Sequence, residues 1–265
     1  MQSFMFRSIS VIGTGNVAWH LVKMFGSLDI PVSGIAGRNE SKLKEFGNEF
    51  GIEGTLLKEN YTPKGDIVFI AVTDSAIKEV ISMINPTNSI IVHCSASTSA
   101  DIFSGKFERY GVFYLYQTFT KGSELNYHEI PVILEANNED TLNKLNTLAV
   151  NISDKIYFLN LRQRRFLHLA GIMACNFTNH MYNLSFKIME DNKIDTALLL
   201  PLIKSTARKV EDMHPGKAQT GPAYRGDTQI MMDHLKLLES YSDIKEIYLH
   251  ISESIAKYKQ KEKDS

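Results

Sequence analysis

The chain has 265 residues and a formal net charge of −1 at pH 7, which allows one large or two smaller domains and gives no reason to expect nucleic acid or an anionic membrane as partner. Cys94 and Cys175 are the only cysteines and lie far apart, so neither a disulfide framework nor a zinc site is indicated. No apolar stretch could span a bilayer, and Met1–Ser10 lacks the apolar core of a signal peptide, so we expect a cytoplasmic protein.

A glycine-rich turn joins the first strand-like run, Ile9–Val11, to the first helix-like run, Trp19–Val22. Its first glycine allows a tight turn, its second lets backbone N–H groups approach a pyrophosphate, and the final alanine keeps helix and strand packed. A GxGxxA sequence in this strand–turn–helix context predicts a dinucleotide site. The candidate cofactor contacts in it are Gly13, Thr14, Gly15, Asn16, Val17 and Ala18.

The residues after the second strand-like run, Ile30–Ala36, indicate which dinucleotide is bound. An Asp or Glu at this point would hold the ribose 2′-OH of NAD, but the chain continues Gly37-Arg38-Asn39. Arg38, with Asn39 beside it, stands where a guanidinium would bind a 2′-phosphate, so the sequence favours NADP. Alternatively, Arg38 is a solvated loop cation and Asn39–Ser41 only caps the next helix.

Two near-continuous apolar runs, Asp66–Val72 and Ser89–His93, are typical of parallel strands buried on both faces. Between them Asp74–Val80 resembles a capped helix start and Asn85–Asn88 a turn. The residues that follow the two strands should line the path of the dinucleotide: Val72, Thr73, Asp74, Cys94 and Ser95. For Thr73 and Ser95 a helix-cap role is an equal alternative, and Cys94 has no evident base that would make it a nucleophile.

Further strands are predicted at Gly111–Tyr116, Ile130–Glu135 and Lys155–Leu159, with a helix near Glu139–Val150. The fold class is therefore α/β: a Rossmann-type, mostly parallel sheet domain over residues 1–160, followed by an all-helical domain over residues 161–265. The helical domain begins with one helix of roughly thirty residues, marked by three- and four-residue steps. These apolar positions are Phe166, Leu169, Ala170, Met173, Phe177, Met181 and Leu184.

Three more helices are predicted at about Asp195–Met213, Thr228–Leu238 and Asp243–Lys259, before a charged tail at Lys257–Ser265. The length and apolar character of the first helix would be easiest to explain if a second subunit covered it. We therefore expect a homodimer formed through the helical domain.

Three segments carry a resemblance to a known family: Gln219-Thr220-Gly221-Pro222-Ala223-Tyr224-Arg225-Gly226-Asp227, Tyr116-Gln117-Thr118-Phe119, and His168-Leu169-Ala170-Gly171 running to Asn176. Over essentially its whole length the chain resembles a bacterial group of NADP-binding oxidoreductases related to pyrroline-5-carboxylate reductase and to deazaflavin-dependent NADP oxidoreductases. The resemblance implies a Rossmann domain, a helical and dimerising second domain, and NADPH as cofactor. The chain departs from many relatives at Tyr114-Leu115-Tyr116, where they carry a proline.

Hydride transfer also needs a proton donor and groups that orient the substrate. His168 is the first candidate acid because it lies early in the long helix and imidazole titrates near neutral pH; a core histidine bonded to a backbone carbonyl is the alternative. Asn176 is the second catalytic candidate: it is turned by about 80° from His168 on a straight helix, close enough to reach the same cleft but not to stack directly on it. Thr220 is a third candidate for the catalytic site, where it could bond to the substrate, and Gln117 and Thr118 are candidates for substrate contacts.

Two arginine-containing segments have both a binding and a structural interpretation. Arg225 could bind a substrate carboxylate while Asp227 caps the next helix, or the two could form an ion pair that fixes the loop. Arg162, Arg164 and Arg165 could attract an anion or form a solvated face.

The sequence thus favours an NADP-dependent reductase that delivers hydride to a C=O or C=N bond of a small molecule. Two alternatives stay open: an NADP(H)-binding sensor or assembly protein without turnover, and a deazaflavin:NADP reductase.

Overall fold

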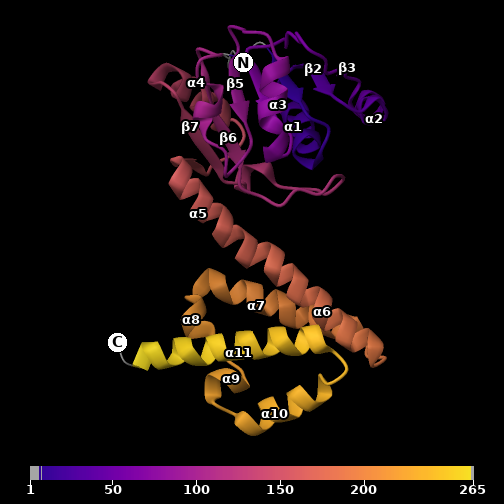
Figure 1. The fold of residues 1–265 in the computed structure, drawn as a ribbon, viewed down its shortest axis with the longest axis vertical. Coiled ribbons are helices and arrows are strands. Elements are labelled where there is room, and N and C mark those ends of the chain that lie inside the picture. Colours follow the sequence, from indigo (N-terminus) through magenta and orange to yellow (C-terminus); the bar gives the residue numbers. More distant parts are fainter. Residues whose placement is uncertain (1–5, 7, 264–265) are drawn as a thin grey trace. The chain divides into compact units, whose positions relative to one another are not determined.

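The computed structural model describes Phe6 and residues 8–263. Most of the amino-terminal segment considered for a signal peptide, and the end of the charged tail, lie outside these residues. The chain forms two compact units, residues 1–176 and 177–265 (Figure 1). The predicted boundary at residue 160 coincides with the start of helix α5 (Leu161–Gly171), but the contacts of this helix belong to the first unit.

An eight-stranded sheet forms the centre of the first unit, in the order β3-β2-β1-β4-β5-β6-β7-β8. All neighbours pair in parallel except β6 and β7, which confirms the predicted mostly parallel sheet. The strand order reverses between β1 and β4, and in such sheets ligands bind at the carboxyl ends beside this point. The strands are β1 (Ile9–Ile12), β2 (Val32–Gly37), β3 (Gly54–Leu56), β4 (Ile67–Ile70), β5 (Ile90–His93), β6 (Tyr110–Leu115), β7 (Val132–Ala136) and β8 (Ile156–Phe158).

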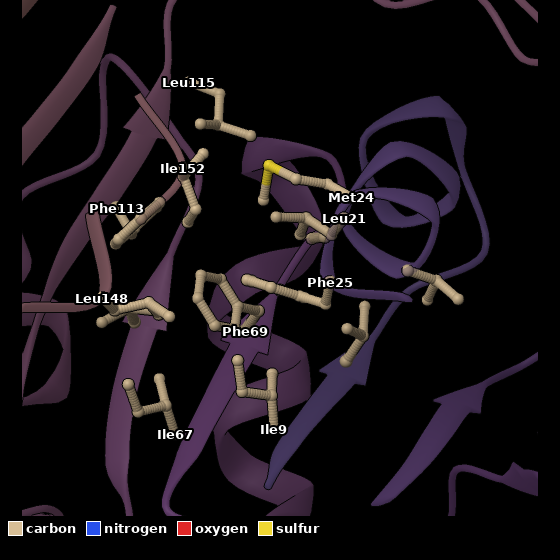
Figure 2. Close-up of a cluster of buried hydrophobic side chains, with 14 of the residues drawn as sticks. Ile9, Leu21, Met24, Phe25, Ile67, Phe69, Phe113, Leu115, Leu148 and Ile152 are labelled. Atoms are coloured by element: carbon tan, nitrogen blue, oxygen red, sulfur yellow. The ribbon is translucent and has the colours of Figure 1, made fainter. Parts of the chain in front are cut away.

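Successive side chains of the central strands point to opposite faces of the sheet, and those on both faces are apolar. Helices therefore cover both faces. On one face Phe69 of β4 packs between Phe25 and Phe113, with ring centroids 5.2 and 5.3 Å away (Figure 2). This face is covered by α1 (Asn16–Ser27), α2 (Glu40–Phe50) and α4 (Glu139–Ala149), and the other by α3 (Asp74–Met83) and the 3₁₀ turn η1 (Ala100–Phe103).

The short strand β3 was not predicted from the sequence. It has only three residues at the sheet edge, of which Gly54 and Thr55 are exposed, so it carries no apolar periodicity. Its register comes from pairing with β2. A second 3₁₀ turn, η2 (Tyr127–Glu129), precedes β7.

The predicted long helix is present and has one interruption. It comprises α5, a π-helical turn η3 (Ile172–Phe177) and α6 (Thr178–Asp191). The predicted helix Asp195–Met213 is a 3₁₀ turn η4 (Thr196–Leu199) followed by α7 (Leu200–Asp212), with Pro201 in its first turn. The remaining helices are α8 (Pro215–Ala218), α9 (Pro222–Arg225), α10 (Thr228–Leu237) and α11 (Ser242–Lys263). Among the described residues, no helix has both the length and the apolar character needed to cross a membrane.

Candidate functional site

The turn between β1 and α1 has the geometry that a dinucleotide-binding loop requires. Gly13 has φ 138°, and a Cβ there would lie 2.1 Å from the Ala71 carbonyl oxygen, so only glycine fits. A Cβ on Gly15 would meet nothing within 4 Å, which leaves this residue open to a ligand. No side chain of the described residues caps the start of α1, so its first N–H groups are available to an anion.

A cavity of about 590 Å³ opens beside this loop, at the carboxyl ends of the strands. Nine of the predicted cofactor contacts line it: Thr14, Gly15, Asn16, Val17, Arg38, Val72, Thr73, Asp74 and Cys94. It also contains residues that the sequence interpretation missed, namely Lys42, Ala71, Ala76 and Phe119, and it contains Gln117, which was assigned to the substrate. The dimensions and the open glycine loop fit a dinucleotide.

Four predicted cofactor contacts lie outside this lining. Gly13 supports the turn, and Ala18 is buried between helix and sheet. The Asn39 side chain caps α2 by accepting the Lys42 N–H at 3.0 Å. The Ser95 hydroxyl accepts the N–H groups of Ser97 and Thr98 at 3.1 and 3.0 Å, so it is used within its own loop.

At the far end of the cavity, Arg38 pairs with Glu79 of α3. The guanidinium Nη1 lies 2.8 Å from the Glu79 carboxylate, and both side chains are about half exposed. Lys42 lines the cavity beside Arg38 and adds a second cation. This end of the cavity therefore offers two positive groups to an anion, with Glu79 as a competitor for one of them.

The segment after β6 is held over the glycine loop by side chains of α1. Asn16 donates to the Phe119 carbonyl at 2.9 Å, and the buried His20 contacts the Thr120 carbonyl and the Tyr127 hydroxyl at 2.9 and 3.0 Å. Burial lowers the pKa of His20, so the ring is a neutral bridge between helix and loop. These contacts join segments about a hundred positions apart, and no local pattern predicts them.

A second cavity of about 110 Å³ lies in the same unit and contains the predicted acid. Gln117 lines both cavities, so the two are neighbours. His168 is exposed, and its Nδ1 lies 3.4 Å from the Tyr114 hydroxyl. The alternative of a core histidine therefore does not describe this residue. The lining consists of Tyr114, Tyr116, Gln117, Thr118, His168, Gly171, Ile172, Cys175 and Asn176.

Asn176 lines the same cavity as His168, as regular helix geometry already allowed. A straight α-helix turns Asn176 by about 80° from His168, and the wider i→i+5 turn at Ile172–Phe177 rotates each residue less, which reduces this angle. The turn thus directs the Asn176 side chain further toward this cavity.

Two tyrosines at the end of β6 are site residues that the sequence interpretation missed. Burial, with Tyr116 and Asp74 nearby, raises the pKa of Tyr114 to about 12, so its hydroxyl stays protonated at neutral pH. Tyr116 donates to the Leu167 carbonyl at 3.1 Å and packs against Gly171. Their position at the carboxyl end of β6, a strand parallel to β5, was the available signal, because ligands bind at this edge of the sheet.

The cysteines have different environments. Burial raises the pKa of Cys94 to about 12, which keeps it a thiol at neutral pH and agrees with its assignment as a cofactor contact instead of a nucleophile. Cys175 is exposed in the second cavity.

Thr220 and Arg225 belong to the second unit. Thr220 lines an apolar cavity of about 280 Å³ formed by α6, α9, α11 and the segment before α9. Arg225 pairs with Asp227 at 3.4 Å, which is the structural alternative considered for this segment. Asp227 occupies the cap position of α10 without a capping hydrogen bond from its side chain.

Arg164 differs from both interpretations of the arginine cluster. Its side chain is 0% exposed and pairs with Glu135 at 2.6 Å, so it is neither a solvated residue nor a free anion site. Because Arg164 lies in a polar segment, the sequence predicted an exposed side chain. Packing of α5 on the sheet buries this side chain instead.

Comparison with known proteins gives the same assignment. Residues 8–97 match the family described as NADP oxidoreductase, coenzyme F420-dependent, and residues 130–255 match a domain of unknown function, DUF2520. A Bacteroides fragilis protein assigned as an NADP oxidoreductase is 31% identical, with a TM-score of 0.88, over 96% of this chain and 100% of that chain. The chain belongs to this family of NADP oxidoreductases.

Other solved structures share the fold of this chain. A Thermotoga maritima protein is 25% identical, with a TM-score of 0.70, over 96% of this chain and 99% of that one. The 1-pyrroline-5-carboxylate reductase of Streptococcus pyogenes is 11% identical, with a TM-score of 0.62, over 94% and 98% of the two chains, and shows the fold alone. No functionally curated protein matches the sequence. The family assignment makes the chain an NAD(P)-binding oxidoreductase of this structural class.

Proposed function

We propose that the protein uses NADPH to reduce a C=O or C=N bond of a small molecule. The observation that carries the proposal is that two neighbouring cavities share Gln117 in their linings: one is built around the glycine loop, and the other contains His168 and Tyr114. A cavity of about 110 Å³ is below the usual range of drug-sized pockets, which favours a substrate of few heavy atoms.

The residues of the larger cavity suit each part of the cofactor. The first N–H groups of α1 would hold the pyrophosphate, and Arg38 with Lys42 would hold the 2′-phosphate that distinguishes NADP from NAD. When bound, NADPH supplies the hydride. The cofactor would be oriented along the carboxyl ends of β4 and β5 by Thr73, Asp74 and Cys94.

His168 would supply the proton that the reduced product needs. As the imidazolium, His168 would donate its Nδ1–H to the Tyr114 hydroxyl oxygen and pass its Nε2 proton to the product, which leaves a neutral imidazole. Asn176 and Gln117 would hydrogen-bond the substrate and exclude water from the same cavity.

A panel of small aldehydes, ketones and cyclic imines, assayed by NADPH oxidation, tests this function. Replacement of His168 by Gln should lower kcat by about 10²-fold or more, the usual loss of a general acid, while NADPH affinity stays unchanged. Equal turnover in both proteins would contradict the role of His168, and binding without turnover of any substrate would favour a sensor or assembly protein.

Hydride exchange with a deazaflavin is a second candidate, favoured by the description of the family that residues 8–97 match. Coenzyme F420 replaces the organic panel in the same assay. Its reduction by NADPH at an unchanged rate in the His168→Gln variant would support this candidate, because transfer between two cofactors needs no acid from this histidine.

We also propose that the protein acts as a homodimer through its helical unit. Large apolar side chains of this unit, such as Leu198 and Leu202, are exposed in the single chain. Exposure of this extent marks an interaction surface.

A further inference from the structure

Arg164 is the most completely buried charged residue of the described chain, and its contacts reach a loop beside the cofactor cavity. Its Nη1 donates to the carbonyl oxygens of Ser95 and Ala96, both at 3.0 Å, and of Thr98 at 3.1 Å. Its Nε and Nη2 donate to Glu135 of β7 at 3.2 and 2.6 Å. A buried guanidinium with all these partners is fully compensated and fixes them in one geometry.

The loop Ser95–Ser99 follows β5 and is also held by Arg165 of α5 and Asp74 of α3. Arg165 donates to the Ser97 carbonyl at 3.1 and 3.0 Å, and the Ser97 hydroxyl donates to the carboxylate of Asp74. Asp74 itself lines the large cavity. The loop is therefore connected to both α3 and α5.

Helix α5 carries the proposed acid one turn after Arg164. His168 is four residues further on, so the guanidinium and the imidazole belong to adjacent turns of the same helix. A shift of α5 relative to the loop would move His168 relative to Cys94 and Asp74, which line the cofactor cavity.

We propose that Arg164 is a positioning residue: it clamps the Ser95–Ser99 loop to α5 and so sets the nicotinamide end of the cofactor cavity relative to His168. This proposal rests on the proposed function, because it needs the cavity to hold NADPH. In this role Arg164 contacts neither substrate nor cofactor. It acts through the Ser95–Ser99 loop.

Calorimetric titration with two ligands tests the clamp without any substrate. NADPH occupies the whole cavity, whereas adenosine 2′,5′-bisphosphate has only the adenine half and should not contact the loop. Replacement of Arg164 by Lys removes the fork of donors but keeps the charge, and it should weaken NADPH binding about tenfold, the loss of roughly one hydrogen bond to a charged group. The bisphosphate should bind within twofold of the unmodified protein, and Arg162→Lys, on the exposed face of α5, should leave both affinities unchanged.

The outcomes separate the clamp from the cofactor assignment. If the folded Arg164→Lys protein binds NADPH as tightly as the unmodified chain, or if both ligands weaken equally, the positioning role is wrong. Failure of the unmodified protein to bind NADPH would instead overturn the proposed function, and the clamp with it. If Arg164→Lys does not fold, Arg165→Met offers a second test, because it removes hydrogen-bond donors to the same loop at an exposed position. This variant should weaken the binding of NADPH, but not of the bisphosphate, by about twofold to threefold. An unchanged affinity for NADPH would contradict the clamp.

Discussion

Glu79 is the residue that most directly opposes the proposed phosphate site. Its carboxylate holds Arg38 at 2.8 Å, so a 2′-phosphate must displace or share this partner. An exposed pair of this kind contributes up to about 1 kcal/mol. We expect Glu79→Gln to tighten NADPH binding by about twofold to fivefold and to leave NADH unchanged.

Equilibrium titration of both nucleotides measures this effect. Glu108→Gln removes the same charge at an exposed position outside the cavity and serves as the control. Equal tightening of NADPH and NADH by Glu79→Gln would show that this end of the cavity does not distinguish the two.

His93 gives the stability of the first unit a dependence on pH. Burial and, after it, the charge of Arg164 lower the pKa of His93 to about 4. The ring Nδ1 accepts the Ser95 N–H at 3.1 Å, a hydrogen bond that protonation would break. Since the unfolded chain takes up the proton near pH 6.5, stability is complete above that pH and is lost as the pH falls toward 4, by on the order of 3 kcal/mol.

Urea unfolding between pH 4 and pH 7 measures this term. His93→Asn keeps an acceptor at the same position and should flatten the dependence, whereas His128→Asn, at an exposed position of the same unit, should preserve it. Parallel curves for the unmodified and His93→Asn proteins would exclude His93 as the source.

At the scale of elements, the contact between α5 and β6 shapes the second cavity. A Cβ on Gly171 would lie 2.6 Å from the Tyr116 hydroxyl oxygen. Gly171→Ala must therefore displace Tyr116, and we expect a loss of about 1–3 kcal/mol of unfolding free energy together with lower turnover.

Gly26 of α1 supplies the control, since a Cβ there would meet nothing within 4 Å. Gly26→Ala should stabilise the protein by about 0.5–1 kcal/mol. Urea unfolding followed by the emission of the single tryptophan, Trp19, reports on both variants. Equal stability of the two alanine variants would contradict the close packing at Gly171.

The sequence predicted those elements whose pattern lies within one short segment of the chain. Gly13 and Gly15 lie in one strand–turn–helix segment, and the apolar runs of β4 and β5 identify strands buried on both faces. It did not predict Tyr114, the Arg38–Glu79 pair or the burial of Arg164, because each depends on partners that only the assembled sheet brings near. Regular helix geometry placed Asn176 within reach of the same cavity as His168, but it did not predict the π-helical turn that rotates the side chain further toward it.

At the scale of the whole molecule, the proposed dimer rests on exposed apolar side chains of the second unit. Leu198 and Leu202 are 68% and 63% exposed and lie four residues apart where η4 runs into α7. Covering a leucine contributes about 2 kcal/mol. We expect a dimer at micromolar concentration and a monomer after Leu198→Glu and Leu202→Glu are combined.

Light scattering gives the mass of each form. Lys204→Glu, which introduces a negative charge at another exposed position of α7, should remain dimeric. A monomeric unmodified protein would contradict the proposed dimer without affecting the assignment of the nucleotide site, which lies within the first unit.

Binding of NADPH is the claim on which the account depends most. Trp19 lies in α1, directly after the glycine loop, and its emission can transfer energy to a reduced nicotinamide. We would titrate NADPH and NADH while following this transfer, with correction for inner-filter absorption. We expect saturable transfer with NADPH bound at least tenfold more tightly than NADH, a difference of about 1.4 kcal/mol. Absence of saturable transfer with either nucleotide, and no rise in melting temperature, would contradict this binding.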